Sequence, residues 1–294
     1  MILLTGATGF VGGHLLEELR KRPEVVRCLV HRSRSPELLR GENVEAVQGS
    51  VLDRSSLNGP MRGVDTVIHL VAVIREKGPA TFQSVNHLGT RNVVQAAREA
   101  GVVRFIHMSA NGARNDPHFP YLLSKWQGEE EVRGSGLPYA ILRPSIIFGE
   151  GDEFITVLAD LIKKLPVVPI IGRGTTRLQP IWVHDVVRCL VAILDRGDSF
   201  LGRETTVGGP QQLTYEQIVD TIISVLDVKR WRVHVPLSIM KPLVRLGERV
   251  LPYPPITSAE LGMLELDNIA APDAVKEQFG FDPLPLREGI DYVR

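Results

Sequence analysis

The sequence of 294 residues has only two cysteines, no net charge and no long apolar run. Cys28 and Cys189 lie in apolar segments and form no C-x-x-C pair, so we expect buried free thiols in a reducing, cytoplasmic setting. Lysine and arginine together number 34, as do aspartate and glutamate, and this balance gives no indication of nucleic acid as a partner. The histidines lack the spacing of motifs such as H-E-x-x-H, so no metal site is predicted.

No segment approaches the roughly 18 consecutive apolar residues that a membrane-spanning helix needs. The longest apolar stretch, Val64–Ile74, is interrupted by Asp65 and His69. The first residues leave no room for the charged and apolar regions of a signal or transit peptide, so none is expected. With 44% hydrophobic and 23% charged residues, the composition is that of an ordinary globular protein.

Short apolar runs alternate with amphipathic segments through the first two thirds of the chain. The runs are rich in Val, Ile and Leu on both faces, which is typical of buried parallel strands. They cover Met1–Leu4, Val25–His31, Val44–Gln48, Thr66–Leu70, Arg104–Met108 and Tyr139–Arg143. The helical patterns between them cover Phe10–Arg22, Thr81–Ala100 and Pro120–Gly134. This alternation predicts an α/β fold of the Rossmann type, with a doubly wound parallel sheet.

The pattern changes after Pro144, where prolines become frequent. Further helices are predicted at Phe154–Leu165, Asp185–Asp195, Tyr215–Leu226 and Ala259–Leu266. We therefore expect a sheet domain over residues 1–150 and a smaller, mostly helical region over residues 151–294, with some segments returning to the sheet. Because ligands bind outside the carboxyl ends of parallel strands, the second region is expected to form the pocket for a small-molecule substrate.

A glycine-rich turn runs from Thr5 to Gly13, between the first predicted strand and the first predicted helix. Gly6 permits a tight turn, Gly9 permits close approach to a pyrophosphate, and Gly12 permits close helix–strand packing. Free N–H groups at the helix start then face the phosphates. The turn therefore predicts dinucleotide binding by Thr5, Gly6, Thr8, Gly9, Phe10, Val11 and Gly12.

The end of the second strand favours NADP(H) over NAD(H). NAD binders usually carry an acidic residue about 20 residues past the loop, to hold the ribose 2′-hydroxyl. Here His31, Arg32 and Ser33 occupy that place, and no acid occurs before Glu37. Arg and Ser can hydrogen-bond a 2′-phosphate that a carboxylate would repel. Asp53 is expected either to accept a hydrogen bond from adenine or to cap the following helix.

These residues resemble the extended and atypical short-chain dehydrogenase/reductase superfamily, over most of the chain. The glycine-rich turn matches the superfamily's loop, and Gly49–Asp53 looks like its adenine segment. Further similar segments are Val67–Ala72, Val85–Asn92, Arg143-Pro144 and Phe148-Gly149. The resemblance implies an NAD(P)-dependent oxidoreductase, epimerase or dehydratase. It also implies that Leu70, Val71, Ala72, Asn86 and Pro144 line the cofactor.

Tyr121 and Lys125 form the Y-x-x-x-K pair of that superfamily. Residues four apart share one face of a helix, so the lysine charge is expected to lower the pKa of the phenol. The tyrosine would then exchange a proton with the substrate, and in the superfamily the lysine also holds the nicotinamide ribose.

The third catalytic residue of the superfamily is a Ser or Thr just after the fifth strand. An alignment on Phe105-Ile106 puts Asn111 at that position, and Ser109 lies two residues earlier. Asn111 offers an amide donor rather than a hydroxyl relay. Two hypotheses therefore stand: an oxidoreductase or epimerase that uses Ser109 or Asn111, and an NADPH-binding structural or assembly protein without turnover.

The second hypothesis also rests on similarity to one branch of the superfamily. Ala7 and the tail from Pro254 to Asn268 look closest to the branch of the NADPH-binding accessory subunit of respiratory complex I. This similarity implies association with a respiratory complex. The apolar and basic stretch Met240–Leu251 is predicted either to rest on a membrane or a partner, or, as the favoured interpretation, to cover the pocket. No oligomeric state is predicted.

Overall fold

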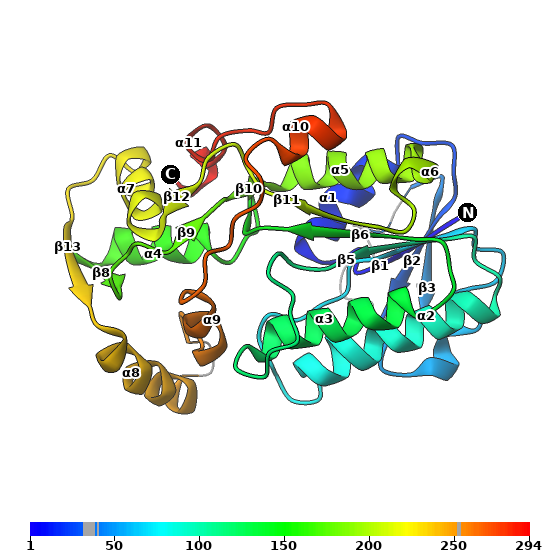
Figure 1. Cartoon of the computed structure of the whole chain (residues 1–294), viewed down its shortest axis with the longest axis horizontal. Helices are drawn as coiled ribbons and strands as arrows, with labels where there is room; N and C mark the ends of the chain where they lie inside the picture. The colour runs from blue at the N-terminus through cyan, green and yellow to red at the C-terminus, as the bar shows by residue number, and fades with distance from the viewer. Residues whose placement is uncertain (32–38, 40, 252–253) are drawn as a thin grey trace. The chain divides into compact units, whose positions relative to one another are not determined.

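The structure, a computed structural model, describes residues 1–31, 39, 41–251 and 254–294. The chain forms two compact units (Figure 1). The first unit comprises Met1–Pro144 together with Val186–Thr205, and the second comprises Ser145–Asp185 together with Thr206–Arg294. A segment far along the chain thus belongs to the first unit.

The described residues of the first unit are built on a seven-stranded sheet. Its strands are β1 (Ile2–Thr5), β2 (Val26–Val30), β3 (Val44–Gln48), β4 (Thr66–His69), β5 (Arg104–Met108), β6 (Tyr139–Pro144) and β11 (Arg203–Val207). The spatial order is β11-β6-β5-β4-β1-β2-β3, and β1 to β6 pair in parallel. The six strands predicted from apolar runs are therefore confirmed. The strand order reverses at β1, which lies between β2 and β4, and such a reversal marks the binding crevice of open sheets.

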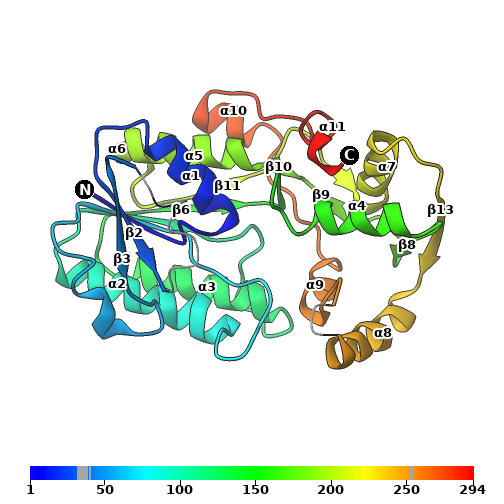
Figure 2. The ribbon, with the colours of Figure 1, turned by 180° about the vertical axis from the view of Figure 1, so that it is seen from behind.

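Helices cover both faces of this sheet, as Figures 1 and 2 show from opposite sides. One face carries α2 (Thr90–Glu99) and α3 (Pro120–Arg133), and the other carries α1 (Phe10–Leu19), α5 (Val183–Asp195) and α6 (Gly197–Phe200). The first face is closed by an apolar core in which Leu3, Val67, Phe105 and Ile141 of the strands are fully buried. This is the predicted doubly wound architecture.

One predicted helix divides into two forms. The segment expected as one helix over Thr81–Ala100 winds as a wider π-type helix, η3 (Phe82–Gly89), before it continues as α2. Thr81 and Ser84 form a reciprocal capping box at its start. Such π-type turns occur frequently at functional sites.

The second unit contains more helix than strand. Its helices are α4 (Ile155–Lys164), α7 (Tyr215–Val225), α8 (Leu237–Val250), α9 (Ser258–Met263), α10 (Ala274–Phe279) and α11 (Leu286–Gly289). Short strands pair two by two: β7 (Ile147–Phe148) with β10 (Ile181–Trp182), β9 (Arg177–Leu178) with β12 (Leu213–Thr214), and β8 (Val167–Ile171) with β13 (Trp231–Val235). Its core joins one face each of α4 and α7 to Val168 and Ile170. In the described part of the chain, no helix has both the length and the apolar character needed to cross a membrane.

Candidate dinucleotide and catalytic site

The glycine-rich turn folds tightly on itself at the end of β1. Gly6 has a φ of +82°, and a Cβ there would lie 3.1 Å from the backbone nitrogen of Val71 at the end of β4. A Cβ on Gly12 would lie 1.9 Å from the Gly6 carbonyl oxygen, and the Gly9 N–H donates to that same oxygen at 2.9 Å. Gly6 and Gly12 are therefore required by geometry, as the sequence predicted.

The start of α1 offers an anion site. Gly9 stands at the N-cap without a side-chain cap, and no acidic residue occupies the first turn. Thr8 and Gly9 are exposed, Phe10 is half-buried and Val11 is buried. Unmatched N–H groups and the positive end of the helix dipole therefore remain available for a phosphate.

A buried chain of hydrogen bonds links this turn to the central helix. Thr5 Oγ1 lies 2.7 Å from His69 Nδ1, and His69 Nε2 lies 3.1 Å from Thr90 Oγ1. The Thr90 hydroxyl donates to the Asn86 carbonyl oxygen at 2.7 Å, so this network assigns the proton of His69 to Nε2 and makes Thr5 the donor to Nδ1. Burial lowers the pKa of His69 to about 3, which keeps the ring neutral. The sequence interpretation noted His69 only as part of a motif.

The side-chain amide of Asn86 is hydrogen-bonded to other residues of the protein. Its side chain is buried, accepts from the Val73 N–H at 2.8 Å, and donates to the Val73 carbonyl oxygen and to Ser124 Oγ. Asn86 therefore holds the segment after β4, which contains Leu70, Val71 and Ala72, against α3. Leu70 is buried, Val71 is half-buried and Ala72 is exposed.

Tyr121 and Lys125 lie on α3, and their environments differ from the sequence expectation. Lys125 is 2% exposed, and its Nζ donates to the Met108 carbonyl oxygen at the end of β5 at 2.8 Å. Burial lowers the pKa of Lys125 to about 8, against an opposing effect of the Glu129 carboxylate. The pKa of Tyr121 was expected to be lowered, but burial raises it to about 12. The expected lowering is therefore wrong for this structure, because burial disfavours the charged phenolate.

Ser109 and Asn111 follow β5 directly. Ser109 is 4% exposed, its N–H donates to the Leu142 carbonyl oxygen, and its hydroxyl has no hydrogen-bond partner among the described residues. The Asn111 N–H donates to the Pro144 carbonyl oxygen at 2.9 Å, which joins the ends of β5 and β6. A buried hydroxyl without a partner is costly, so the Ser109 hydroxyl is an unusual feature of this site.

A second buried histidine, His107 on β5, was not singled out from the sequence. His107 stacks on His69 with ring centroids 5.5 Å apart, and neither of its nitrogens has a partner among the described residues. Burial, together with the Lys125 charge, lowers the pKa of His107 well below its usual value. The two imidazoles are thus neutral.

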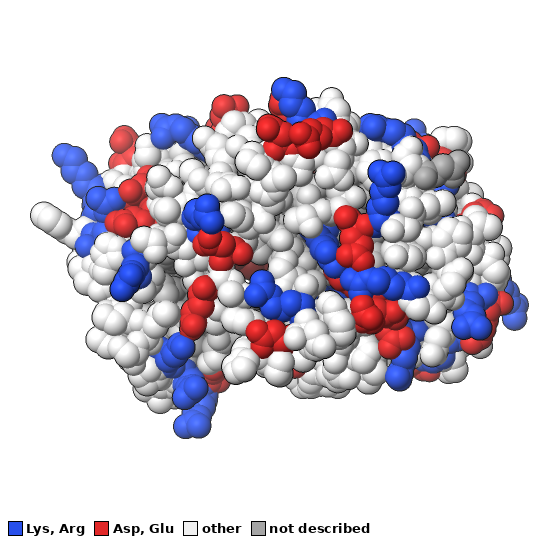
Figure 3. Space-filling view, viewed as in Figure 1, with Lys and Arg blue, Asp and Glu red and all other residues white. Residues whose placement is uncertain are grey.

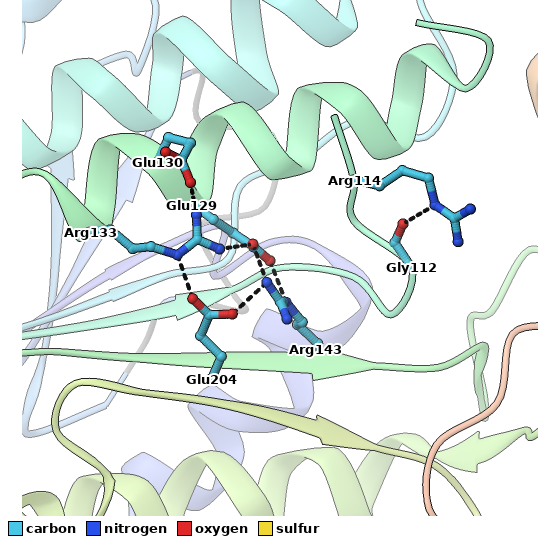
Figure 4. A network of polar contacts seen from close by, with 7 residues as sticks. All are labelled: Gly112, Arg114, Glu129, Glu130, Arg133, Arg143 and Glu204. Atoms are coloured by element: carbon cyan, nitrogen blue, oxygen red, sulfur yellow. Dashed lines mark hydrogen bonds and ion pairs between the residues drawn. The ribbon is translucent and has the colours of Figure 1, made fainter. Parts of the chain in front are cut away.

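Glu129, four residues after Lys125 on α3, is the centre of an ion network (Figure 4). Its carboxylate is fully buried and accepts from Arg133 Nη2 at 2.6 Å and from Arg143 Nε at 2.7 Å. Arg143 on β6 also pairs with Glu204 of β11 at 2.6 Å. The network ties α3 to two strands and places a negative charge near Lys125. In the loop after β5, Arg114 Nε donates to the Gly112 carbonyl oxygen at 3.0 Å.

Only part of the segment expected to select NADP(H) over NAD(H) lies within the described residues. His31 is exposed just after β2, whereas Arg32 and Ser33 lie outside the described residues. Asp53 caps the short helix η2 (Arg54–Leu57) by accepting from the Ser55 N–H at 3.0 Å and from its hydroxyl at 2.7 Å. The capping role expected of Asp53 is therefore observed.

Comparison with known proteins finds a matching family model and several relatives of the chain. Residues 2–208 match the family model described as the NAD dependent epimerase/dehydratase family. The chain is 28% identical to the mitochondrial NADH dehydrogenase (ubiquinone) 1 alpha subcomplex subunit 9 of Arabidopsis thaliana, over 93% of this chain and 71% of that protein. It is 35% identical to a ceramide reductase of Caulobacter vibrioides, over 65% of this chain and 60% of that protein.

A third relative and two solved structures agree with these matches. A 3 beta-hydroxysteroid dehydrogenase/Delta 5-->4-isomerase of Mycobacterium tuberculosis is 27% identical over 96% of this chain and 86% of its own length. The crystal structure of gox2253 is similar with a TM-score of 0.78 and 26% identity, over 99% of this chain and 96% of that one. The NAD-bound dTDP-glucose 4,6-dehydratase DesIV of Streptomyces venezuelae shares the fold, with a TM-score of 0.77, 19% identity, and coverage of 100% and 95%.

Proposed function

The chain belongs to the NAD dependent epimerase/dehydratase family, and from this premise we propose that it is an NADP(H)-dependent oxidoreductase acting on a carbonyl or hydroxyl group. The observation that carries the proposal is the arrangement at the end of β5. There the buried ammonium of Lys125, which lies on the helix that carries Tyr121, donates to the carbonyl oxygen of Met108. The next residue is Ser109, whose hydroxyl has no hydrogen-bond partner among the described residues.

The residues of the turn fit a dinucleotide. Gly6 and Gly12 leave no room for side chains, and the uncapped start of α1 suits a pyrophosphate. Thr5, Thr8, Gly9, Phe10 and Val11 complete the set that would hold it. When bound, the nicotinamide supplies hydride transfer. Asp53 is proposed to retain room to accept from adenine with its second carboxylate oxygen.

The preference for NADP(H) rests on charge at the end of β2. His31, Arg32 and Ser33 replace the acidic residue that an NAD site usually has, and a 2′-phosphate carries charge that arginine binds well. Leu70, Val71, Ala72, Asn86 and Pro144 are proposed to shape the rest of the cofactor site, with Asn86 acting through the backbone that it holds.

Tyr121 is proposed as the acid/base, and Lys125 as the charge that makes it effective. A phenol with a pKa of about 12 holds its proton firmly, so it needs a neighbouring cation to yield it near neutral pH. We propose that Lys125, which a pKa of about 8 leaves mostly protonated at pH 7, supplies this cation once cofactor and substrate are bound. Without them its ammonium donates to the Met108 carbonyl oxygen. Ser109, rather than Asn111, is the favoured donor to the substrate oxygen, since its hydroxyl is unpartnered among the described residues.

The substrate class is proposed to be an apolar alcohol or ketone. Relatives of this chain are named for ceramide reduction and for 3 beta-hydroxysteroid dehydrogenation. Similarity to the complex I subunit supports a second candidate, a cofactor-holding protein that turns nothing over.

One experiment separates these two candidates. NADPH and NADH are titrated by fluorescence into wild type and Tyr121→Phe, and turnover is measured with long-chain and steroidal ketones. Tyr121→Phe should lose turnover by at least roughly a hundredfold, the usual value of a general acid, while its NADPH affinity stays unchanged. Tight NADPH binding without turnover in wild type would favour the cofactor-holding role, and tighter binding of NADH would refute the cofactor preference.

A further inference from the structure

Exposed apolar side chains are concentrated on one part of the second unit. Twelve large hydrophobic side chains are exposed in the described part of the chain. Three of them, Leu52, Ile74 and Val103, are scattered over the first unit. The other nine fall within two short stretches, 165–167 and 231–251. Single exposed apolar residues are normal on protein surfaces, whereas such a concentration marks an interaction site.

Helix α8 carries most of these side chains in one stripe. Ile239, Leu243, Leu246 and Val250 follow one another at spacings of four, three and four residues, and are 51, 55, 59 and 68% exposed. Val244 is the buried residue of this helix. The apolar stripe of this helix is therefore exposed, and the interpretation in which the stretch covers a pocket stays a prediction.

The strand that leads into α8 continues this apolar character. In the β8–β13 pair, Trp231 lies opposite Val167 and Val233 lies opposite Pro169. The alternate residues of β8, Val168 and Ile170, point into the core. Trp231, Val233 and Val167 are 80, 51 and 41% exposed, so the outer face of this pair is apolar and uncovered. We call Val167, Trp231, Val233 and the four stripe residues of α8 the apolar surface.

Positive charge accompanies the apolar surface. Residues 229–251 contain six Lys or Arg and one acidic residue, whereas the whole chain has equal numbers of basic and acidic residues. Lys241 and Arg232 are paired with Glu265 and Asp220. Arg245 and Arg249 follow Lys241 at intervals of four along α8, are exposed, and form no ion pair within the described residues. Figure 3 shows basic side chains beside uncharged surface at the end of the second unit where α8 lies.

We propose that the apolar surface docks the protein on lipid bilayers with anionic headgroups. A helix with an apolar stripe and basic residues beside it lies in the plane of the interface, where anionic lipids attract its cations. Tryptophan is enriched at this depth. A second copy of the chain is a poorer occupant, because a two-fold interface would bring the same excess positive charge from both sides.

The test measures cosedimentation of the full chain with vesicles. Phosphatidylcholine vesicles are compared with vesicles that also contain phosphatidylglycerol, at low and high salt. The protein should sediment with the anionic vesicles, and high salt should weaken this binding. Trp231 fluorescence should shift to the blue on binding, and Trp231→Phe should remove the shift. Equal binding to both kinds of vesicle, or binding to neither, would overturn the proposal.

Matched variants locate the contact. Leu246→Glu, at a position 59% exposed, should reduce binding by roughly tenfold or more, since burial of one leucine side chain is worth that much. Val103→Glu, at a position 62% exposed in the first unit, should bind as wild type. Arg245→Glu with Arg249→Glu should abolish the preference for anionic vesicles. Because all these side chains are exposed, thermal unfolding and NADPH titration should be unchanged. A dimer that Leu246→Glu dissociates, without vesicle binding in wild type, would instead identify a second copy as the occupant.

Discussion

Replacing Lys125 with methionine should make the protein more stable at neutral pH. The lysine is 2% exposed, and burial lowers its pKa from the ordinary value of 10.5 to about 8. At pH 7 the lysine is protonated in both the folded and the unfolded state. Folding therefore buries a charged ammonium in surroundings that favour the neutral amine, and this lowers the free energy of unfolding. At about 1.4 kcal/mol per pH unit, the cost to the folded state is roughly 3 kcal/mol.

Methionine removes this cost but also one hydrogen bond. In this variant the Met108 carbonyl oxygen loses the Lys125 donor, and the lost hydrogen bond offsets about 1 kcal/mol of the gain in the free energy of unfolding. The expected net gain in the free energy of unfolding is therefore about 2 kcal/mol at pH 7. NADPH affinity and turnover should fall in the same variant, because Lys125 is the proposed ribose ligand and the cation beside Tyr121.

The pH dependence gives the sharper test. Between pH 8 and about 10.5 the unfolded wild type keeps the lysine proton that the folded protein has released, so its free energy of unfolding rises with pH. The advantage of Lys125→Met should shrink over this window and vanish above it. Cys28, Tyr121 and Tyr215, whose pKa values burial raises to about 12, lower stability at high pH in both proteins and cancel in the difference.

The assay is urea unfolding at several pH values, followed by the fluorescence of Trp126 on the same helix. Lys276→Met is the control: this lysine is exposed, and its bond to Asp282 raises its pKa, so its removal should bring no gain. A Lys125→Met variant that is less stable than wild type by a constant amount at every pH would refute the reasoning.

Three further predictions use matched pairs. Gly12→Ala should abolish dinucleotide binding in a fluorescence titration, because the added Cβ would lie 1.9 Å from the Gly6 carbonyl oxygen. Gly13→Ala should bind the dinucleotide as wild type does, because the atom nearest to its added Cβ is 4.0 Å away. Glu129→Gln should lower the free energy of unfolding by about 3 kcal/mol or more, since Arg133 and Arg143 lose a buried partner. The exposed Glu130→Gln should cost less than about 1 kcal/mol in the same urea unfolding assay. Equal losses in the two variants would contradict the assigned network. Ser109→Ala should reduce turnover without loss of thermal stability. Ser135→Ala should lose stability, because the buried Ser135 hydroxyl donates to the Val132 carbonyl oxygen at 2.6 Å. Destabilisation by Ser109→Ala would show that the Ser109 hydroxyl makes a hydrogen bond that stabilises the fold.

The sequence by itself determined the features that depend on neighbouring residues. The turn from Thr5 to Gly13 and the six strands β1 to β6 follow from local patterns of glycine and apolar residues, and both are found where they were expected. The spacing of Tyr121 and Lys125 also placed them on one helix. These patterns are readable because backbone conformation and the burial of one face are set within a few residues.

Only the tertiary structure decided the features that join distant segments. Strand β11 comes about sixty residues after β6 along the chain and carries too little apolar character to be predicted as its neighbour. The partner of Lys125 is a carbonyl 17 positions earlier, and His69 bonds Thr5 and Thr90 across 64 and 21 positions. The exposure of the apolar face of α8 could not be predicted either, because an amphipathic pattern indicates that one face of a helix is apolar but not what packs against it. Local rules fix the direction of a side chain along its own element, whereas its partner, and therefore its pKa, depends on which element packs there.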